Sequence, residues 1–308
     1  MTSPILLDGY VAVVTGAGRG IGRAHAREFA RRGAKVVVND LGREHADAVV
    51  AEIRDAGGVA VPSYDTVATA EGGRAVMEVA IEQFGTVDIV VNNAGNVSNG
   101  YFEDLSPEAI ENVIAVHLKG AFFVTQPAWR VMKQKGYGRV IMTCSSSGMF
   151  SHQGLSNYAA AKAGVFGLCK ALAFEGEPHG ILVNALLPGA STTIAAADPI
   201  PDMDKYWTDD YRSVMEPRRR AEAVAPMAVI LASPACPVTG EAFAAMSGWY
   251  ARVFVAQASG WATPDVSTVT AEDIVEHWDE IRDLDGFSVP KNTFEDMRGV
   301  ANAVAGLG

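Results

Sequence analysis

The chain has 308 residues, and its 49% apolar content is enough for a sizeable core in one large or two modest domains. Its 25 Lys and Arg against 36 Asp and Glu give a formal net charge of −11, which argues against a general nucleic-acid or anionic-membrane surface. The three cysteines lack metal-ligand spacing and lie in apolar stretches, so we expect buried free thiols, no zinc site and no disulfide framework.

The chain shows no targeting or membrane segment. Its first residues carry neither a basic region nor a long apolar run, and no stretch approaches 18 uninterrupted apolar residues. Residues 305–308 do not form a peroxisomal Ser-Lys-Leu signal. We therefore expect a cytoplasmic protein with no membrane, nucleic-acid or metal partner.

Short apolar runs alternate with longer segments of helical period. We predict strands at residues 11–15, 35–39, 59–61, 87–91, 139–143, 181–185 and 241–246. We predict helices at residues 21–32, 44–55, 72–84, 107–135 and 158–175. This alternation is typical of a parallel sheet, and strands that are apolar throughout are expected where helices cover both faces. The sequence therefore predicts an α/β fold with a doubly wound, Rossmann-type parallel sheet.

Two regions depart from the alternation. Residues 190–220, with Tyr206 and Trp207, follow a strand that should end at the carboxyl edge of the sheet, and we predict that they form a substrate lid. Helical patterns near residues 270–284 and 293–304 predict a C-terminal helical extension. We expect one domain over residues 1–250 that includes the lid. The extension, residues 251–308, should pack on the same domain or on a dimer.

A glycine-rich turn joins the first strand to the first helix, with the sequence Thr-Gly-Ala-Gly-Arg-Gly-Ile-Gly over residues 15–22. Glycines there allow a tight turn and a close approach of backbone amides to a pyrophosphate at the helix N-terminus. The predicted contacts are Gly16, Arg19, Gly20, Ile21 and Gly22. Because Ile21 takes the third glycine position of the common dinucleotide motif, a plain tight connection is the alternative.

Asp40 ends the second strand about twenty residues further on, where a carboxylate can accept hydrogen bonds from the ribose hydroxyls of NAD. It would repel the 2′-phosphate of NADP, so NAD is the predicted cofactor. Arg19 and Arg43 could each reach such a phosphate and leave NADP as the less favoured alternative.

Polar and small residues follow the third and fourth strands. Asp65, next to Thr66, could hydrogen-bond the adenine edge, or could be an exposed loop acid. The run Asn-Asn-Ala-Gly over residues 92–95 permits close approach of the cofactor, and an amide side chain there can brace neighbouring strands. We assign Asn93, Ala94 and Gly95 to the cofactor site, with a plain polar turn as the alternative.

Tyr158 and Lys162 lie four residues apart on a predicted helix, so they share one face. The Lys162 ammonium can then favour the phenolate of Tyr158, which would make the phenol a general base near neutral pH. Ser145, after the strand at residues 139–143, could hydrogen-bond the substrate oxygen whose charge changes. The three residues together predict a site for hydride transfer.

These motifs, with Pro188 and Gly189, have the order and spacing of the short-chain dehydrogenase/reductases, which the chain resembles over about residues 5–250. The resemblance implies that Tyr158 is the general acid/base and that Ser145 orients the carbonyl or hydroxyl. It further implies that Lys162 binds the nicotinamide ribose and lowers the Tyr158 pKa. Pro188, Gly189 and Thr193 would lie at the cofactor, with Thr193 on its carboxamide. A homodimer or homotetramer built on the helices at residues 107–135 and 158–175 is also implied.

His117 occupies a position where members of the family usually carry a catalytic Asn, which leaves the proton relay open. This departure and the long C-terminal extension resemble a narrower branch. That branch contains the (3R)-hydroxyacyl-CoA dehydrogenase unit of peroxisomal multifunctional β-oxidation enzymes and related bacterial acyl-CoA and steroid dehydrogenases.

The resemblance favours NAD-dependent oxidation of a secondary alcohol as the function, with a 3-hydroxyacyl-CoA as substrate. The run of arginines at residues 218–220 could pair with CoA phosphates, or could be a solvated charge run. A free hydroxysteroid or other hydrophobic alcohol is the alternative substrate, held by an apolar clamp of Tyr206, Trp207, Met149 and Phe150. A non-enzymatic NAD-binding scaffold is the remaining alternative.

Overall fold

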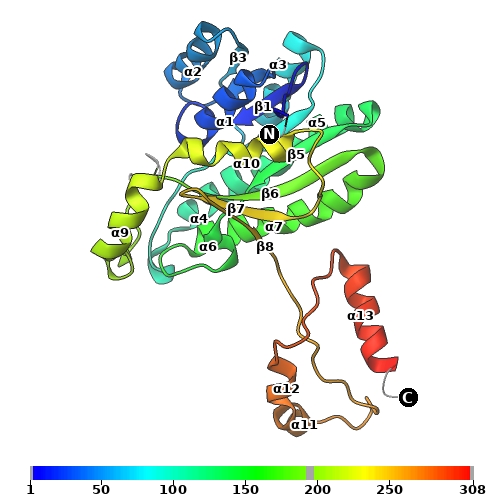
Figure 1. The fold of residues 1–308 in the computed structure, drawn as a ribbon. Helices are drawn as coiled ribbons and strands as arrows, with labels where there is room; N and C mark the ends of the chain where they lie inside the picture. Colours follow the sequence, from blue (N-terminus) through cyan, green and yellow to red (C-terminus); the bar gives the residue numbers. More distant parts are fainter. Residues whose placement is uncertain (1–2, 192–197, 306–308) are drawn as a thin grey trace. The chain divides into compact units, whose positions relative to one another are not determined.

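A mixed sheet of eight strands forms the centre of the larger of two compact units into which the chain divides, Met1–Arg252 and Val253–Gly308 (Figure 1). The computed structural model describes residues 3–191 and 198–305. The strand order is β3-β2-β1-β4-β5-β6-β7-β8, and β3, β2, β1, β4, β5, β6 and β7 pair in parallel. Their bounds are β1 Val11–Thr15, β2 Lys35–Asn39, β3 Val59–Ser63, β4 Ile89–Asn92, β5 Gly138–Thr143, β6 Ile181–Gly189 and β7 Ala242–Met246. The predicted doubly wound, Rossmann-type sheet is therefore confirmed.

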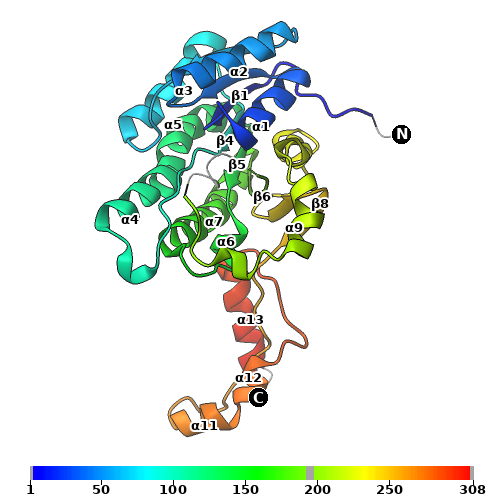
Figure 2. The same cartoon turned by 90° about the vertical axis from the view of Figure 1, so that its left-hand side faces the viewer.

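Helices cover both faces of this sheet. On one face, α1 (Gly20–Arg31) packs against α2 (Arg43–Asp55) and α10 (Ala225–Ala232). On the other lie α3 (Ala70–Phe84), α5 (Gly120–Lys135) and α7 (Ser156–Gly176). Figure 2 shows α5 and α7 on one side of β4, β5 and β6 and α1 on the other. The chain reverses its direction of winding between β1 and β4, and open sheets of this kind bind ligands at such a switch point.

The core explains why the strands are apolar throughout. All five residues of β1 and all six of β5 are buried, because both faces of each strand meet a helix layer. Phe29 of α1 is fully buried against the sheet, in one cluster with Val14 and Val38. At the outer edge, β3 has Pro62 paired with Val38, so one residue of this edge strand lacks a backbone N–H.

The helix predicted over residues 107–135 is interrupted. It consists of α4 (Pro107–Ile114), a single π turn over Ala115–Lys119, and α5. Sequence periodicity misses such a turn because one extra residue shifts the helical phase without introducing a glycine or proline break.

Several elements were not predicted, among them one strand and one helix of the larger unit. Strand β8 (Trp249–Val253) follows β7 through a two-residue turn in which Ser247 and Gly248 have φ of 53° and 85°, the conformation that reverses a chain in a hairpin. Helix α10 is apolar on all sides, so it shows no amphipathic period. Further short elements are α6 (Ser146–Met149), α9 (Asp209–Met215) and 3₁₀ turns at Phe102–Asp104, Glu177–His179, Met203–Lys205, Glu216–Arg218 and Ala221–Ala223.

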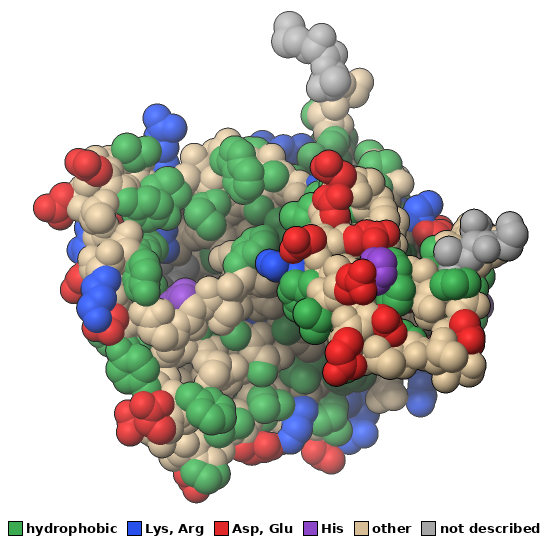
Figure 3. Space-filling model, turned by 90° about the horizontal axis from the view of Figure 1, so that it is seen from below, with side chains coloured by type: hydrophobic (Ala, Val, Ile, Leu, Met, Phe, Trp, Pro, Cys, Tyr) green, Lys and Arg blue, Asp and Glu red, His purple; other side chains and the backbone are tan. Residues whose placement is uncertain are grey.

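The smaller unit contains the helices expected at its end. These are α11 (Ala271–Glu276), which begins with a capping box between Thr270 and Asp273, α12 (Trp278–Arg282) and α13 (Thr293–Ala305). No residue between 253 and 305 is buried. Residues 253–308 hold ten Asp and Glu against three Lys and Arg, and acidic side chains gather on the face seen from below (Figure 3). Its predicted packing on the larger unit or on a dimer stays a prediction.

No helix in the described ranges is both long and apolar enough to span a bilayer. The same ranges contain no group of three or more His, Cys, Asp and Glu that could hold a metal ion.

Acidification should destabilise the fold through His25 of α1, which is fully buried, stacks on Phe29, and has no hydrogen-bond partner for either ring nitrogen among the described residues. Burial lowers its pKa from 6.5 to about 4. Below pH 6.5 the unfolded chain therefore binds a proton that the folded chain excludes. The contribution of His25 to the free energy of unfolding is therefore constant above pH 6.5, and the free energy of unfolding falls as the pH is lowered from 6.5 towards 4. His25→Phe should reduce the loss of unfolding free energy between about pH 7 and about pH 4.5 by about 2 to 3 kcal/mol.

Urea denaturation at the two pH values measures this difference. An unchanged pH dependence in the variant would show that His25 is not the group responsible.

Candidate active site

A cavity of about 1020 Å³ opens at the carboxyl ends of the parallel strands in the larger unit. This volume lies at the upper end of the usual range for small-molecule sites. The predicted site residues that line it are Gly16, Arg19, Gly20, Ile21, Gly22, Asp40, Thr66, Asn93, Ala94, Gly95, Ser145, Tyr158, Lys162, Pro188 and Gly189. Thr193 lies outside the described residues. The structure thus brings together residues from the connections after β1 to β5, from helix α7 and from the end of β6.

The glycine-rich turn is held against the β4 loop by two side chains. The Thr15 hydroxyl donates to Val91 O (3.2 Å) and accepts from the amides of Asn93 and Ala94, both at 3.0 Å. In return the Asn93 side-chain amide donates to Thr15 O (2.9 Å) and Gly16 O (3.1 Å). The predicted bracing role of an amide in this loop therefore falls to Asn93.

Two glycines of the turn have no room for a side chain. A Cβ on Gly16 would lie 2.8 Å from Ala94 Cα, and one on Gly22 would lie 2.2 Å from Gly16 O. Helix α1 begins at Gly20, so Gly22 belongs to its first turn, and the N-cap residue Arg19 makes no side-chain cap. The first-turn amides of α1 therefore remain available to an anion, and no acidic residue opposes one there. This arrangement fits the pyrophosphate of a dinucleotide.

Asp40 lines the cavity and directly follows β2. In the sheet, β1 and β4 lie between β2 and β5, the strand that leads to Ser145. The Asp40 carboxylate accepts from Gly18 N (3.0 Å) and from Gly42 N (2.9 Å), so both oxygens have fixed positions. Arg19 lines the same cavity, whereas the guanidinium of Arg43 stacks on the Tyr64 ring at 3.7 Å and does not line it. The Asp40 carboxylate thus keeps lone pairs that can accept further hydrogen bonds. The exposed Arg19 lines the same cavity.

Asp65 is not part of the cavity wall. Its backbone carbonyl accepts from the Asn39 side chain (2.9 Å) and its carboxylate accepts from Ser63 Oγ (3.4 Å). The structure therefore brings Thr66, but not Asp65, to the other predicted residues. Asp65 follows β3 as expected, yet its orientation is set by bonds to neighbouring strands that the sequence position does not reveal.

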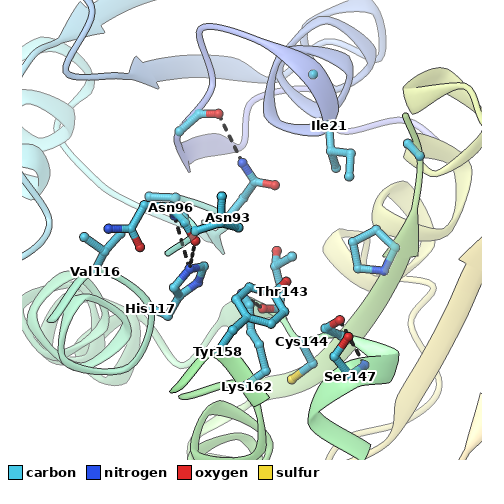
Figure 4. A pocket seen from close by; sticks show the side chains of 18 of the residues that line it. Ile21, Asn93, Asn96, Val116, His117, Thr143, Cys144, Ser147, Tyr158 and Lys162 are labelled. Atoms are coloured by element: carbon cyan, nitrogen blue, oxygen red, sulfur yellow. Dashed lines mark hydrogen bonds between the residues drawn. The ribbon is translucent and has the colours of Figure 1, made fainter. Parts of the chain in front are cut away.

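Helix α7 places Tyr158 and Lys162 on one face, as their spacing predicts (Figure 4). Lys162 is buried, its Nζ donates to Thr143 O (2.6 Å), and Nζ lies 5.7 Å from the centre of the Tyr158 ring. Ser145 begins α6 and its hydroxyl accepts from Ser147 N (3.1 Å). The end of β5, through Thr143 and Ser145, and helix α7 therefore converge on the phenol.

Burial dominates the pKa values at this end of the cavity. It raises the pKa of Tyr158, and the hydrogen bond with Ser145 opposes that rise. It lowers the pKa of Lys162 to about 8 and raises that of the neighbouring Cys144 to about 12, so this thiol stays neutral. The expected lowering of the Tyr158 pKa by Lys162 is not found among the protein's own interactions. Both groups are enclosed, and desolvation is the main influence on each of them.

Residues 10–203 match the family model of the short chain dehydrogenases. The chain belongs to this family. It is 37% identical to the peroxisomal multifunctional enzyme type 2 of Mus musculus over 314 residues, which cover 99% of this chain and 41% of that protein. A short-chain type dehydrogenase/reductase of Mycobacterium tuberculosis is 38% identical over 91% of this chain and 96% of its own length.

The solved structure of the full-length peroxisomal multifunctional enzyme type 2 of Drosophila melanogaster has a TM-score of 0.80 and 33% identity. The match covers 98% of this chain and 51% of that one. This short-chain dehydrogenase thus spans about half or less of these two multifunctional enzymes. Related structures have been solved with NADP in one case and with NADH in another.

This dehydrogenase carries His117 in the cavity wall, on the π turn between α4 and α5. The side chain is 6% exposed, and its Nε2 lies 2.8 Å from Asn96 O and 3.1 Å from Asn96 N. Burial, and then the Lys162 ammonium, lower its pKa to about 3, so the imidazole is neutral. Figure 4 shows it facing Tyr158.

Part of the predicted lid borders the cavity, through Ile200, Met203, Tyr206, Trp207, Tyr211 and Arg219. Of the expected apolar clamp, Tyr206 and Trp207 line the cavity, whereas Met149 and Phe150 do not, and Phe150 is 73% exposed. Phe150 is the C-cap residue of the short helix α6. Of the arginine run at residues 218–220, only Arg219 lines the cavity among the described residues.

Sequence reasoning missed a set of polar side chains in the wall. They are Asn96, Asn99, Asn112, Ser147, His152 and Gln153. Asn96 follows the recognised Asn-Asn-Ala-Gly run directly and could have been included for that reason. The others are single polar residues on different loops and helices, so only the fold shows that they meet.

Replacing Asn93 by Asp should weaken dinucleotide binding more than replacing it by Ala. The carboxylate would face Thr15 O and Gly16 O, two acceptors that now receive hydrogen bonds, whereas Ala only removes the donors. Titration calorimetry with NADH should show an affinity about tenfold lower for Asn93→Asp than for Asn93→Ala. Equal, undiminished affinity in both variants would rule out the brace as a support of the binding site.

Proposed function

We propose that this short-chain dehydrogenase interconverts a secondary alcohol and a ketone with NAD as the hydride acceptor. One observation carries the proposal: a single cavity joins the uncapped N-terminus of α1 to the convergent side chains of Ser145, Tyr158 and Lys162. Anion-binding amides at one end and a proton-transfer group at the other are the two requirements of a dinucleotide-dependent alcohol oxidation.

The residues present fit the proposed cofactor. The amides that begin α1 would hold the pyrophosphate, and the free lone pairs of Asp40 would accept from ribose hydroxyls, which favours NAD over NADP. When bound, NAD supplies the acceptor for the hydride that leaves the carbinol carbon, together with a positive charge near Tyr158. That charge offsets the desolvation that raises the Tyr158 pKa.

The side chains divide the proton chemistry between them. Tyr158 Oη takes the proton of the substrate hydroxyl during oxidation and returns it during reduction. Ser145 Oγ hydrogen-bonds the same substrate oxygen as its charge changes. Lys162, held by Thr143 O and with a pKa of about 8, is mostly protonated at neutral pH and would donate to the ribose of the bound cofactor.

A 3-hydroxyacyl-CoA is the substrate class we propose, supported by the similarity to the multifunctional enzymes and by the position of Arg219. The Arg219 side chain is 16% exposed, stacks on Trp207 at 4.4 Å and pairs with Glu216 at 3.2 Å. A guanidinium held in this way presents its remaining N–H groups to a phosphate. Since residues 253–308 carry an excess of seven acidic groups, the larger unit is only weakly acidic.

The second candidate is a free hydroxysteroid or other hydrophobic alcohol. It is favoured by the aromatic side chains at the cavity wall, where Trp207 and Tyr211 pack edge to face at 5.2 Å with Tyr206 beside them in the sequence. Flat apolar surfaces of this kind suit a polycyclic ligand. A cytoplasmic location and a homodimer or homotetramer stay predictions.

Tyr158→Phe should abolish turnover and keep cofactor binding. Loss of the only proton-transfer hydroxyl should lower kcat about 10²- to 10⁴-fold, while the Kd of NADH changes less than about threefold. Tyr250→Phe is the matched control, because its hydroxyl bonds Ala223 O at 2.7 Å and does not line the cavity. Undiminished turnover in Tyr158→Phe would contradict the mechanism, and a wild-type protein that binds NADH but oxidises no alcohol would favour a binding protein.

Paired substrates should separate the two candidate classes. Initial rates of NADH and NADPH formation are measured with each acyl group offered as its free hydroxy compound and as its CoA thioester. We expect NAD-linked activity with at least about tenfold higher kcat/KM on the thioesters, and a raised thioester KM in Arg219→Gln but not in Arg218→Gln. Equal or better rates on the free alcohols would remove CoA recognition and favour the hydrophobic alcohol.

A further inference from the structure

A single π turn brings one buried side chain to the phenol of Tyr158. In this turn, Ala115–Lys119, His117 is the buried residue, and it lines the cavity. An extra residue in a helix widens the turn and is uncommon, and such turns occur frequently at functional sites. The placement of His117 therefore depends on a local distortion that ordinary α-helical packing of residues 107–135 would not need.

The imidazole contacts the Tyr158 ring edge to face. The ring centres are 5.1 Å apart and the planes meet at 89°. This geometry is the favourable one for two aromatic rings, because the positive edge of one meets the negative face of the other. The His117 ring is thus a further contact of the phenol, besides Ser145 and Lys162.

The other side of the imidazole is tied to the backbone that follows β4. Nε2 can donate to Asn96 O at 2.8 Å or, in the other tautomer, accept from Asn96 N at 3.1 Å. The chain passes so close that a Cβ on Gly95 would lie 2.5 Å from His117 Cε1. The His117 side chain therefore packs between the loop after β4, at Gly95 and Asn96, and the ring of Tyr158.

The charges around His117 keep it neutral. Lys162 is the charged group that acts on it, Tyr158 is the other titratable group in contact, and burial together with Lys162 lowers the His117 pKa to about 3. A neutral ring adds no positive charge that would compete with the Lys162 ammonium. Its contribution at the site is geometric, because the neutral ring brings no charge to it.

We propose that His117 is a positioning residue of this site, which holds the Tyr158 phenol in hydrogen-bonding alignment with Ser145 by joining it to the backbone of Asn96. The inference rests on the proposed function, since it assigns the alignment to the group that would move the proton. The same role should be measurable in the protein without cofactor, through the pKa of Tyr158. The hydrogen bond with Ser145 is the interaction that lowers the Tyr158 pKa, so a misaligned phenol should have a higher pKa.

Two variants and one control test the proposal. His117→Phe keeps an aromatic edge and loses the tie to Asn96, and His117→Gln keeps an amide donor and loses the ring. His25→Phe is the control, because His25 is the other buried histidine of lowered pKa and does not line the cavity. The Tyr158 phenol is titrated by NMR with ¹³Cζ-labelled tyrosine, assigned with Tyr158→Phe, and steady-state rates are measured with the preferred alcohol.

The His117 variants should show an upward shift of the Tyr158 pKa and of the apparent pKa in the kcat profile, and a kcat lowered about 10- to 100-fold with KM changed less than about threefold. The His25 variant should show neither change. Unchanged Tyr158 titration and kcat in both folded His117 variants would overturn the proposal, as would a purely KM-based loss. If the wild-type protein oxidises no alcohol while the titration still shifts, the proposed function fails and the positioning role stands.

Discussion

The close approach of the β1 turn to the β4 loop is the constraint on which the rest of the structure depends. One hydroxyl, that of Thr15, accepts from two amides of the β4 loop and donates to Val91 O, and the Asn93 amide returns two bonds to the β1 turn. This small network lies where the winding of the sheet reverses. It requires small residues at Gly16 and Ala94, and it sets the start of α1, the β4 loop and, through Asn96, the position of His117.

Much of the fold and part of the site could be predicted because their causes are local. Strands such as β1 are uniformly apolar since both faces are covered, and an i, i+4 spacing places Tyr158 and Lys162 on one face of any helix. The π turn, the hairpin strand β8 and helix α10 could not be predicted, since each depends on packing that leaves no periodic signal. Asp65 shows the same limit at the site, because cross-strand bonds decide where it lies.

At the site of Tyr158 and Lys162, burial affects the pKa values more than the four-residue spacing of the two side chains does. Sequence spacing alone suggests that Lys162 lowers the Tyr158 pKa, yet the structure buries both groups and desolvation raises the one and lowers the other. The protein therefore holds a neutral phenol and a weakly basic amine side by side, beside a neutral imidazole. A cation that enters a site of this kind lowers the pKa of the phenol and favours its ionised, proton-accepting form.

The two edge strands of the sheet have features that oppose aggregation through strand addition. An edge strand offers unpaired backbone groups to any other extended chain and is a starting point for aggregation. Along β3, Pro62 removes one donor, and at the opposite edge β8 is only five residues long, with Arg252 paired to Glu241. Charge, short length and a missing N–H each make strand addition less favourable. Both edge strands are therefore poor templates for intermolecular β-structure.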